Sequence, residues 1–177
     1  MKNKLFINEL PIETERLIIK PTTKEDIELL LKLDKQEITQ KFLGGVKNKT
    51  KEERLEFLDK KEQKFNQGIA SSLTVFLKAT NTSIGFVGTK INEEQNYSEI
   101  SYIFDVDHTK KGYCTESMKK IIEIIFKKVQ LSKIYADTIE DNESSKKVLL
   151  NLGFNHIGKK NENNIVFDEY ELYNENN

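Results

Sequence analysis

Along this chain, apolar residues recur with two spacings, one typical of helices and one typical of strands. The firmest helical pattern has apolar side chains at i, i+3, i+4, i+7, i+8 and i+11, which places them on one helix face. These positions are Met118, Ile121, Ile122, Ile125, Phe126 and Val129. Short runs rich in β-branched and aromatic residues predict strands at 16–21, 72–79, 84–91, 98–106, 133–139, 154–158 and 164–173.

Polar residues mark where the other helices begin. Thr22 with Glu25, and Thr50 with Glu53, have the spacing of a capping box, and each pair precedes a segment with apolar residues at helical spacing. Asn142 is a natural N-cap for a short helix that ends at the sequence LGF. We therefore expect helices after each of these three starts.

The order of the elements predicts the fold class. A strand and a helix open the chain, a second helix and three strands follow, and a crossover through the 118–129 helix leads to the strand at 133–139. We expect an α/β (α+β) fold with a mixed, mainly antiparallel central sheet flanked by helices. With 177 residues, the chain is long enough for one substantial core, so we expect a single domain over 1–177.

Composition narrows the possible partners. Lys and Arg together number 28 and Asp and Glu number 29, so no overall field attracts nucleic acid or an anionic membrane. No apolar segment approaches the ~20 residues of a membrane span, and the N-terminus lacks a secretory apolar region. Cys114 is the only cysteine, and with His108 and His156 it forms no metal-ligand spacing. We expect a cytoplasmic protein without a metal, either a monomer or a homodimer, that binds neither nucleic acid nor membrane.

The stretch HTKKGYCTES, residues 108–117, separates the third strand of the central group from the amphipathic helix. A helix that begins at the end of a strand points unpaired N–H groups and a positive dipole end at any neighbouring anion, which suits a pyrophosphate. Gly112 permits a close approach of the backbone. By itself the stretch favours an ordinary helix start, because it fits neither GxGxxG nor the P-loop pattern.

Two longer segments change this interpretation. The chain contains TERLIIKPTTKEDIELLLKL at 14–33 and GYCTESMKKIIEIIFKKVQLSKIYADTIEDNESSKKVLLNLGF at 112–154. In order and spacing these segments resemble the GNAT acyltransferase superfamily, specifically its ribosomal-protein N-acetyltransferase-like branch, and the resemblance extends from about 14 to 173. It implies that acetyl-CoA binds where the strands at 98–106 and 133–139 splay apart, with Phe104 at the bulged, splayed end beside the pantetheine arm.

The resemblance also implies a set of cofactor-binding residues. The family's pyrophosphate loop, Arg/Gln-x-x-Gly-x-Gly/Ala, falls on residues 109–114, where Gly112 matches and Thr109 replaces the long donor. Lys110 stands where a second glycine is frequent, and Cys114 replaces a small Gly or Ala. Backbone amides, which any residue supplies, make most of the contacts in this loop. The implied acetyl-CoA-binding residues are Phe104, Thr109, Lys110, Lys111, Gly112, Tyr113, Cys114, Thr115, Asn142 and Ser145.

The catalytic residues implied by the resemblance are Ser145 and Glu99. Ser145 occupies the small-residue position of the family's Asn-x-x-Ala/Ser pattern, on the helix face shared with Leu149. Leu149 stands where many members have a tyrosine acid, so Ser145 is the substitute proton donor. Glu99, on the strand leading into the site, is the expected base for the amine. Weaker candidates, each with an ordinary packing or surface role as the alternative, are Asp105, Asp107, His108, His156, Tyr102, Tyr113, Tyr170 and a nucleophilic Cys114.

The implied function is direct transfer of an acetyl group from acetyl-CoA to a primary amine, either a protein N-terminus of the ribosomal-protein type or a small amine. Two alternatives stay open: an antibiotic or polyamine acetyltransferase, and a non-catalytic acyl-CoA-binding module. The segments expected to border the acceptor are the helix at 51–67, the loop at 35–50 and the NEEQNY turn.

Overall fold

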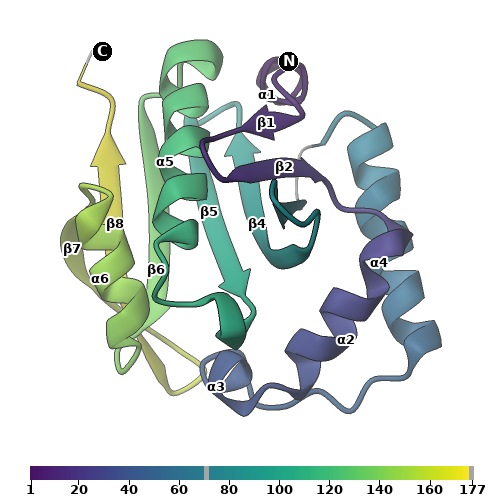
Figure 1. Ribbon diagram of the computed structural model, residues 1–177. Helices are drawn as coiled ribbons and strands as arrows, with labels where there is room; N and C mark the ends of the chain where they lie inside the picture. The colour runs from purple at the N-terminus through teal and green to yellow at the C-terminus, as the bar shows by residue number, and fades with distance from the viewer. Residues whose placement is uncertain (70–71, 176–177) are drawn as a thin grey trace.

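The computed structural model describes residues 1–69 and 72–175, which form one mixed sheet with helices packed on it (Figure 1). Within these residues, eight strands are hydrogen-bonded in the order β1-β2-β3-β4-β5-β6-β8-β7. They are β1 (Ile12–Glu13), β2 (Leu17–Pro21), β3 (Leu73–Leu77), β4 (Ser83–Asn92), β5 (Tyr97–Phe104), β6 (Lys133–Ile139), β7 (Asn155–Glu162) and β8 (Ile165–Tyr173). Among the described pairs only β5 and β6 run parallel. The predicted mixed, mainly antiparallel sheet is confirmed.

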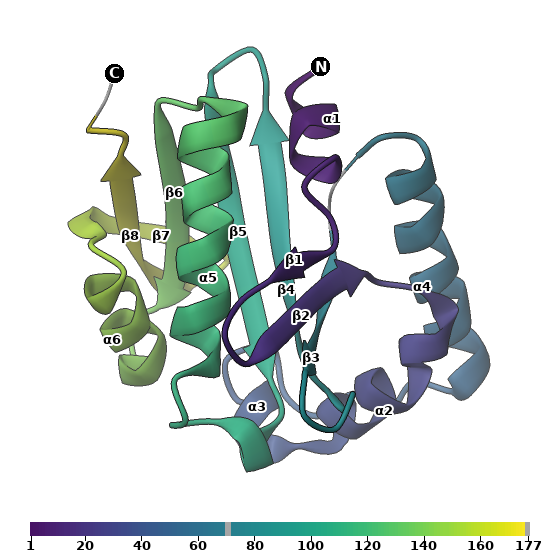
Figure 2. The same cartoon turned by 45° about the horizontal axis from the view of Figure 1, so that its top comes forward.

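The helices lie on both sides of this sheet. In Figures 1 and 2, α5 runs lengthwise over β5 and β6 with α6 beside it, and α2 and α4 lie side by side beyond β2. The helices are α1 (Lys2–Ile7), α2 (Ile27–Lys35), α3 (Glu37–Gln40), α4 (Lys51–Asn66), α5 (Tyr113–Ile124) and α6 (Glu143–Asn151). Short turns of other types occur at Lys24–Asp26, Val106–His108 and Ile125–Val129.

The main core lies between α5 and the sheet. Met118, Ile121, Ile125 and Val129 have at most 1% of their surface exposed, which confirms the predicted apolar face. Complete burial of each such side chain stabilises the fold by about 1.5–3 kcal/mol. The α-helix ends at Ile124, and a π-helical turn carries the same face on to Val129.

A second, smaller core covers the other face of the sheet. Leu29 and Leu33 of α2 pack on Phe86 of β4 and Ile103 of β5. Phe104, the neighbour of Ile103, belongs instead to the main core, because successive side chains of a strand point to opposite faces. Both faces of β5 are therefore occupied before the strand ends.

The first helix start differs from its prediction by one residue. The capping box is Thr23 with Asp26, whereas Thr22 and Glu25 were expected. Thr22 is buried, its backbone N–H continues the strand pairing to Ser72, and its hydroxyl bonds the Ser72 and Thr74 hydroxyls instead of a helix N–H. The box formed by Thr50 and Glu53 is confirmed.

The N-terminal segment adds elements that the apolar pattern did not indicate. Helix α1 packs on the π-helical turn after α5, and its Phe6 is completely buried. In the described part of the chain, no helix combines the length and apolarity needed to cross a bilayer.

Candidate active site

The parallel strands β5 and β6 stay paired over only three residues. Their register joins 97–99 to 133–135, and beyond this point the strands diverge. The main-chain groups of 100–104 that face β6 therefore have no partner strand among the described residues. A cleft of about 1180 Å³ opens at this divergence, and residues of both strands line it.

Phe104 ends β5 at the mouth of this cleft. Its register against β4 is unbroken as far as Gly85, so the opening comes from divergence from β6 and not from a bulge against β4. A Cβ atom on Gly85 would lie 2.6 Å from the Ile103 carbonyl oxygen and 2.7 Å from the Phe104 ring. The close approach of β4 that supports Phe104 therefore requires a glycine.

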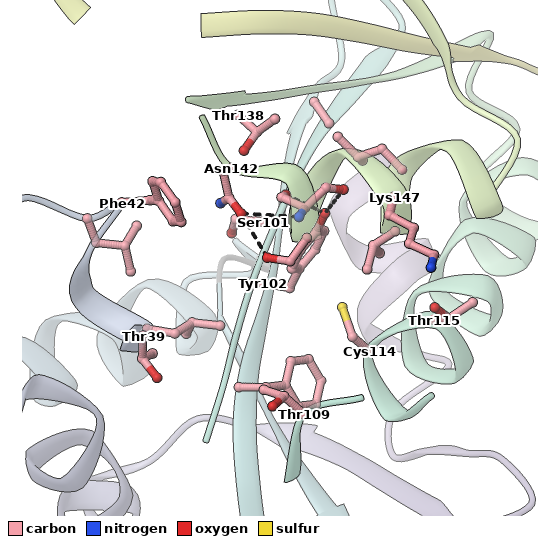
Figure 3. Close-up of a pocket in the computed structure, with 18 of the residues that line it drawn as sticks. Thr39, Phe42, Ser101, Tyr102, Thr109, Cys114, Thr115, Thr138, Asn142 and Lys147 are labelled. Atoms are coloured by element: carbon pink, nitrogen blue, oxygen red, sulfur yellow. Dashed lines mark hydrogen bonds between the residues drawn. The ribbon is translucent and has the colours of Figure 1, made fainter. Parts of the chain in front are cut away.

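The cleft passes through the sheet from one face to the other. Ser101 and Tyr102 are neighbours on β5 and point to opposite faces, yet both line the cleft, as do Asp137 and Thr138 on β6. Figure 3 shows Tyr102 in the middle, Thr39 and Phe42 of the α3 region on one side, and Cys114, Thr115 and Lys147 on the other.

The loop before α5 has the conformation of an anion-binding helix start. Gly112, the N-cap, has φ +82°, and Lys110 has φ +58°. Lys110 thus adopts the left-handed conformation that glycine adopts more readily. No side chain in the described residues caps the helix. The first-turn N–H groups and the positive end of the helix dipole are therefore available to an anion in the cleft.

Nine of the ten predicted cofactor-binding residues line the cleft. They are Phe104, Thr109, Lys110, Gly112, Tyr113, Cys114, Thr115, Asn142 and Ser145. Lys111 is the exception, because its Nζ donates to the Asp107 carbonyl oxygen at 2.7 Å, outside the cleft lining.

Ser145 and Tyr102 bring two hydroxyl groups together inside the cleft. Their oxygens are 2.8 Å apart, and the Tyr102 hydroxyl also lies 3.3 Å from the Ser145 carbonyl oxygen. Burial raises the pKa of Tyr102 above its ordinary value of 10, and this effect outweighs the hydrogen bond to Ser145, which lowers the pKa. Tyr102 therefore stays protonated at neutral pH. When Tyr102 donates to Ser145, the Ser145 hydrogen is free to point at a ligand.

Asn142 sets the position of Ser145. Its Oδ1 accepts from the Ser145 backbone N at 3.2 Å and from the Ser144 hydroxyl at 2.9 Å, which confirms the predicted N-cap of α6. Asn142 and Ser145 are thus adjacent because one caps the other.

The Cys114 thiol lies in the cleft lining but has the wrong charge state for a nucleophile. Burial raises the pKa of this thiol to about 12, so almost none of it is thiolate at neutral pH. A buried thiol of this kind behaves as a small apolar side chain.

The structure places Glu99 outside this cleft. Glu99 lines a smaller neighbouring hollow of about 540 Å³, where Lys90 Nζ lies 3.1 Å from its carboxylate and the Tyr97 hydroxyl donates to it at 3.3 Å. The carboxylate that does line the main cleft is Asp137, which pairs with Lys160 Nζ at 2.6 Å. Sequence reasoning missed Asp137, because its access to the cleft depends on where β6 leaves β5.

Asp105 holds the end of β5 instead of reaching into the cleft. Its buried carboxylate accepts from Lys32 Nζ at 2.5 Å and Gln36 Nε2 at 2.7 Å, and His108 Nδ1 lies 3.2 Å away. Burial by itself raises the pKa of Asp105, but these hydrogen bonds outweigh it and lower the pKa to about 2. Asp105 therefore stays ionised and ties α2 to the entrance of the α5 loop.

The other weak candidates lie in different surroundings. His108 and Tyr113 line the cleft, whereas Asp107 pairs with Lys32 at the surface. His156 Nε2 lies 2.9 Å from the Asp168 carboxylate and its ring contacts Tyr170 edge-on, in packing between β7 and β8.

Part of the loop at 35–50 forms the wall opposite α5 and α6. The segment from α3 onward contributes Ile38, Thr39, Lys41, Phe42 and Leu43 to the cleft lining. Ile38 and Leu43 are 73% and 51% exposed, although both are apolar. The loop at 35–50 was expected to border the acceptor, but its sequence has no periodicity that singles out these side chains.

Comparison with known proteins agrees with this geometry. The family model of the acetyltransferase (GNAT) domain matches residues 16–155, so the chain belongs to the GNAT family of acetyltransferases. The uncharacterized N-acetyltransferase YoaA of Bacillus subtilis (strain 168) is 24% identical over 148 residues, which cover 83% of this chain and 84% of that protein.

Solved structures share the fold. The ribosomal-protein-S5-alanine acetyltransferase from Vibrio fischeri superposes with a TM-score of 0.73 at 20% identity, over 93% of this chain and 96% of that one. The spermidine N-acetyltransferase from Vibrio cholerae, in complex with CoA and spermine, gives 0.78 at 15% identity, over 91% and 97%. Family membership and the cleft together define an acetyl-CoA-dependent N-acetyltransferase.

Proposed function

We propose that this enzyme acetylates the N-terminal amine of a protein by direct attack of the amine on acetyl-CoA. The observation that carries the proposal is the cleft that passes through the sheet where β5 and β6 diverge. One side of it offers an uncapped helix start, and the other side is an apolar wall. Two substrates can therefore enter from opposite faces and meet between the strands.

The residues of the first side fit acetyl-CoA, which supplies the thioester carbonyl. The α5 start and the loop at 110–112, in which Lys110 and Gly112 are left-handed, hold the pyrophosphate through backbone N–H groups. The unpaired main-chain groups of 100–104 hold the pantetheine arm and polarise the carbonyl. Thr115 lines the same side, and Lys147 of α6 adds a positive charge.

The second side supports an acceptor with a single positive charge. Its apolar lining comes from Ile38, Phe42, Leu43, Ile103, Ile139 and Phe167, and Thr39 and Lys41 are polar members of the same wall. Among the described lining residues Asp137 is the only carboxylate, and Lys160 already pairs with it. A polyamine carries several charges that would each require a partner away from water. A protein N-terminus brings one ammonium group next to its own backbone and side chain.

Ser145 is the proposed proton donor to the departing CoA sulfur. Tyr102 orients it and, with its raised pKa, contributes a hydroxyl that stays protonated. This pair takes the place of a single tyrosine at position 149, where the chain has a completely buried Leu149.

Two carboxylates are candidates for the base that takes the amine proton. Glu99 lies in the adjoining hollow and would act through water, whereas Asp137 lines the cleft itself. The isosteric variants Glu99→Gln and Asp137→Asn separate them. The base is the residue whose variant lowers kcat about a hundredfold and removes the acidic limb of the kcat/KM profile. If neither variant does so, the amine reaches the site already neutral.

The activity test supplies the purified enzyme with acetyl-CoA and a matched set of acceptors. These are a tetrapeptide with a free N-terminus, the same peptide blocked at its N-terminus but carrying a lysine, spermidine and an aminoglycoside. Released CoA thiol is measured, and mass spectrometry locates the acetyl group. We expect turnover of the free N-terminus only. Faster turnover of spermidine or the aminoglycoside would overturn the acceptor assignment, and CoA binding without turnover of any acceptor would indicate a non-catalytic acyl-CoA-binding module.

A further inference from the structure

A carboxylate in the first turn of α5 is tied to a segment 100 residues away in the sequence. Glu116 accepts from the Thr14 hydroxyl at 2.6 Å, from the Arg16 backbone N at 2.9 Å and from Arg16 Nε at 2.6 Å. Arg16 Nη2 lies 2.6 Å from the same carboxylate. These contacts link the turn between β1 and β2 to the start of α5.

The remaining face of Arg16 contacts the loop before the helix. Its Nη1 donates to the Lys111 carbonyl oxygen at 3.1 Å, and its guanidinium lies 4.5 Å from the centre of the Tyr113 ring. A Cβ atom on Gly112 would lie 3.4 Å from Nη2. Arg16 thus contacts Lys111 and Tyr113, the two neighbours of Gly112, at the point where the loop becomes helix.

This arrangement matters because a first-turn glutamate ordinarily competes with an external anion. Such a carboxylate can fold back onto free helix N–H groups, and its charge repels a phosphate. Burial raises the pKa of Glu116, but its bonds to Thr14 and Arg16 outweigh this and lower the pKa, so Glu116 is ionised. The bonds from Arg16 turn the carboxylate toward β2 and pair its charge.

We propose that Arg16 is a positioning residue for acetyl-CoA binding. Through Glu116 and the Lys111 carbonyl it holds the loop at 110–112 in place and leaves the first-turn N–H groups of α5 free for the pyrophosphate. Arg16 itself is absent from the cleft lining. The proposal rests on the proposed acetyl-CoA site. It assigns to the segment before β2 a role in binding acetyl-CoA, which is independent of the identity of the amine acceptor.

The test compares Arg16→Gln with the parent enzyme using two acetyl donors. Acetyl-CoA carries the pyrophosphate, whereas S-acetylpantetheine lacks it. We expect Arg16→Gln to raise the KM for acetyl-CoA about tenfold, with kcat and the amine KM within about twofold, because the loss of loop hydrogen bonds weakens binding by that order. The kcat/KM for S-acetylpantetheine should stay unchanged. Arg16→Lys should recover part of the loss.

Glu123→Ala is the matched control. Glu123 lies on the same helix and pairs with Lys120 and Lys127, so the variant also breaks helix ion pairs but leaves the loop untouched. We expect no change in its KM for acetyl-CoA. Equal losses with both donors in Arg16→Gln would indicate a general structural role and overturn the proposal.

Calorimetric titration with CoA supplies a readout that is independent of turnover. A parent enzyme that binds no CoA would refute the acetyl-CoA site itself. A parent that binds CoA with the same affinity as Arg16→Gln would refute only the role of Arg16. If Arg16→Gln fails to fold, Arg16→Lys is titrated in its place, because lysine keeps the charge but cannot bond Glu116 and the Lys111 carbonyl oxygen together. An affinity for CoA equal to that of the parent would again refute the proposal.

Discussion

Two helices begin at the cleft, and their first turns are built in opposite ways. At α6, the Asn142 side chain caps the helix and takes up the Ser145 backbone N–H. At α5, Gly112 offers no side chain, and Glu116 in the first turn is bonded to Thr14 and Arg16 instead of to the helix. Both starts face the same cavity and come from short loops that follow strands.

The difference separates two kinds of recognition. The α5 start leaves backbone N–H groups and a positive dipole end exposed, which suits an anion whatever the side chains are. The α6 start satisfies its own backbone and presents the Ser145 hydroxyl beside Tyr102. One helix start therefore binds charge, and the other supplies a proton donor.

The largest expected effect comes from placing a charge at the α5 start. Gly112→Asp should lower the affinity for acetyl-CoA at least about a hundredfold, because its carboxylate caps the free N–H groups and repels the pyrophosphate. Gly112→Asn is the control, since Asn tolerates the same left-handed φ without the charge. Calorimetry with CoA measures both. Equal losses in the two variants would mean that the space at Gly112 matters and the charge does not.

At the α6 start, the side chain should matter more than the backbone. Ser145→Ala should lower kcat about thirtyfold with little change in the KM for acetyl-CoA, because it removes the donor to the leaving sulfur. Thr115→Val removes a hydroxyl from the first turn of α5 and should change kcat less than about threefold. Steady-state kinetics measure kcat and the KM for acetyl-CoA in both variants. A larger kcat loss in Thr115→Val would reverse the roles of the two helix starts.

The buried Asp105 carboxylate holds the segment before α5 against α2. Because these bonds require the ionised carboxylate, the stability of the fold should decrease in acid. The pKa of Asp105 is about 2 in the folded chain against an ordinary 3.8. Its contribution, on the order of 2 kcal/mol, is complete above about pH 5 and is lost as the pH falls through the folded pKa of about 2. The difference in unfolding free energy between parent and Asp105→Asn should therefore shrink across that range in urea titrations.

Asp107→Asn serves as the control for this prediction. Asp107 contacts the same Lys32, but its side chain is 67% exposed. Its substitution should change stability by less than about 0.5 kcal/mol at any pH. A constant difference for Asp105→Asn between pH 5 and pH 2 would contradict the buried, ionised state of Asp105.

The smallest expected effect is the loss of the α6 cap. Asn142→Ala should lower the free energy of unfolding by about 1 kcal/mol, and Asn142→Ser should lower it by less, because serine also accepts from a first-turn N–H group. Thermal unfolding of the two variants measures this. An Asn142→Ala variant as stable as the parent would show that the cap contributes nothing to the fold.

Local pattern predicted most of the fold. The strand at 133–139 and the buried face from Met118 to Val129 agree with their predictions, because an amphipathic stripe and a β-branched run depend on near neighbours. The capping box at Thr22 was one residue out, since the pairing of Thr22 with Ser72 depends on a strand far along the chain. Helix α1 was missed because its burial depends on the turn after α5.

In the candidate site too, the residues of local motifs were predicted, whereas contacts between distant segments were not. The loop residues and Asn142 with Ser145 follow motifs within a few positions of one another, and nine of the ten predicted cofactor residues line one cleft. Tyr102 was regarded only as a packing or cleft-lining residue, yet its hydroxyl meets Ser145 across 43 positions. Lys111 belongs to the loop, but its side chain lies outside the cleft lining and donates to the Asp107 carbonyl oxygen.

The sequence by itself determined the order of strands and helices, the helix start at Gly112 and the family to which they belong, because these depend on spacing along the chain. Only the tertiary structure decided which groups share the cleft. It placed Asp137 in the cleft and Glu99 in a neighbouring hollow. It also brought the Tyr102 hydroxyl to Ser145 and Arg16 to Glu116. The physical reason is that β5 and β6 part after three paired residues, and that divergence is a property of the whole sheet.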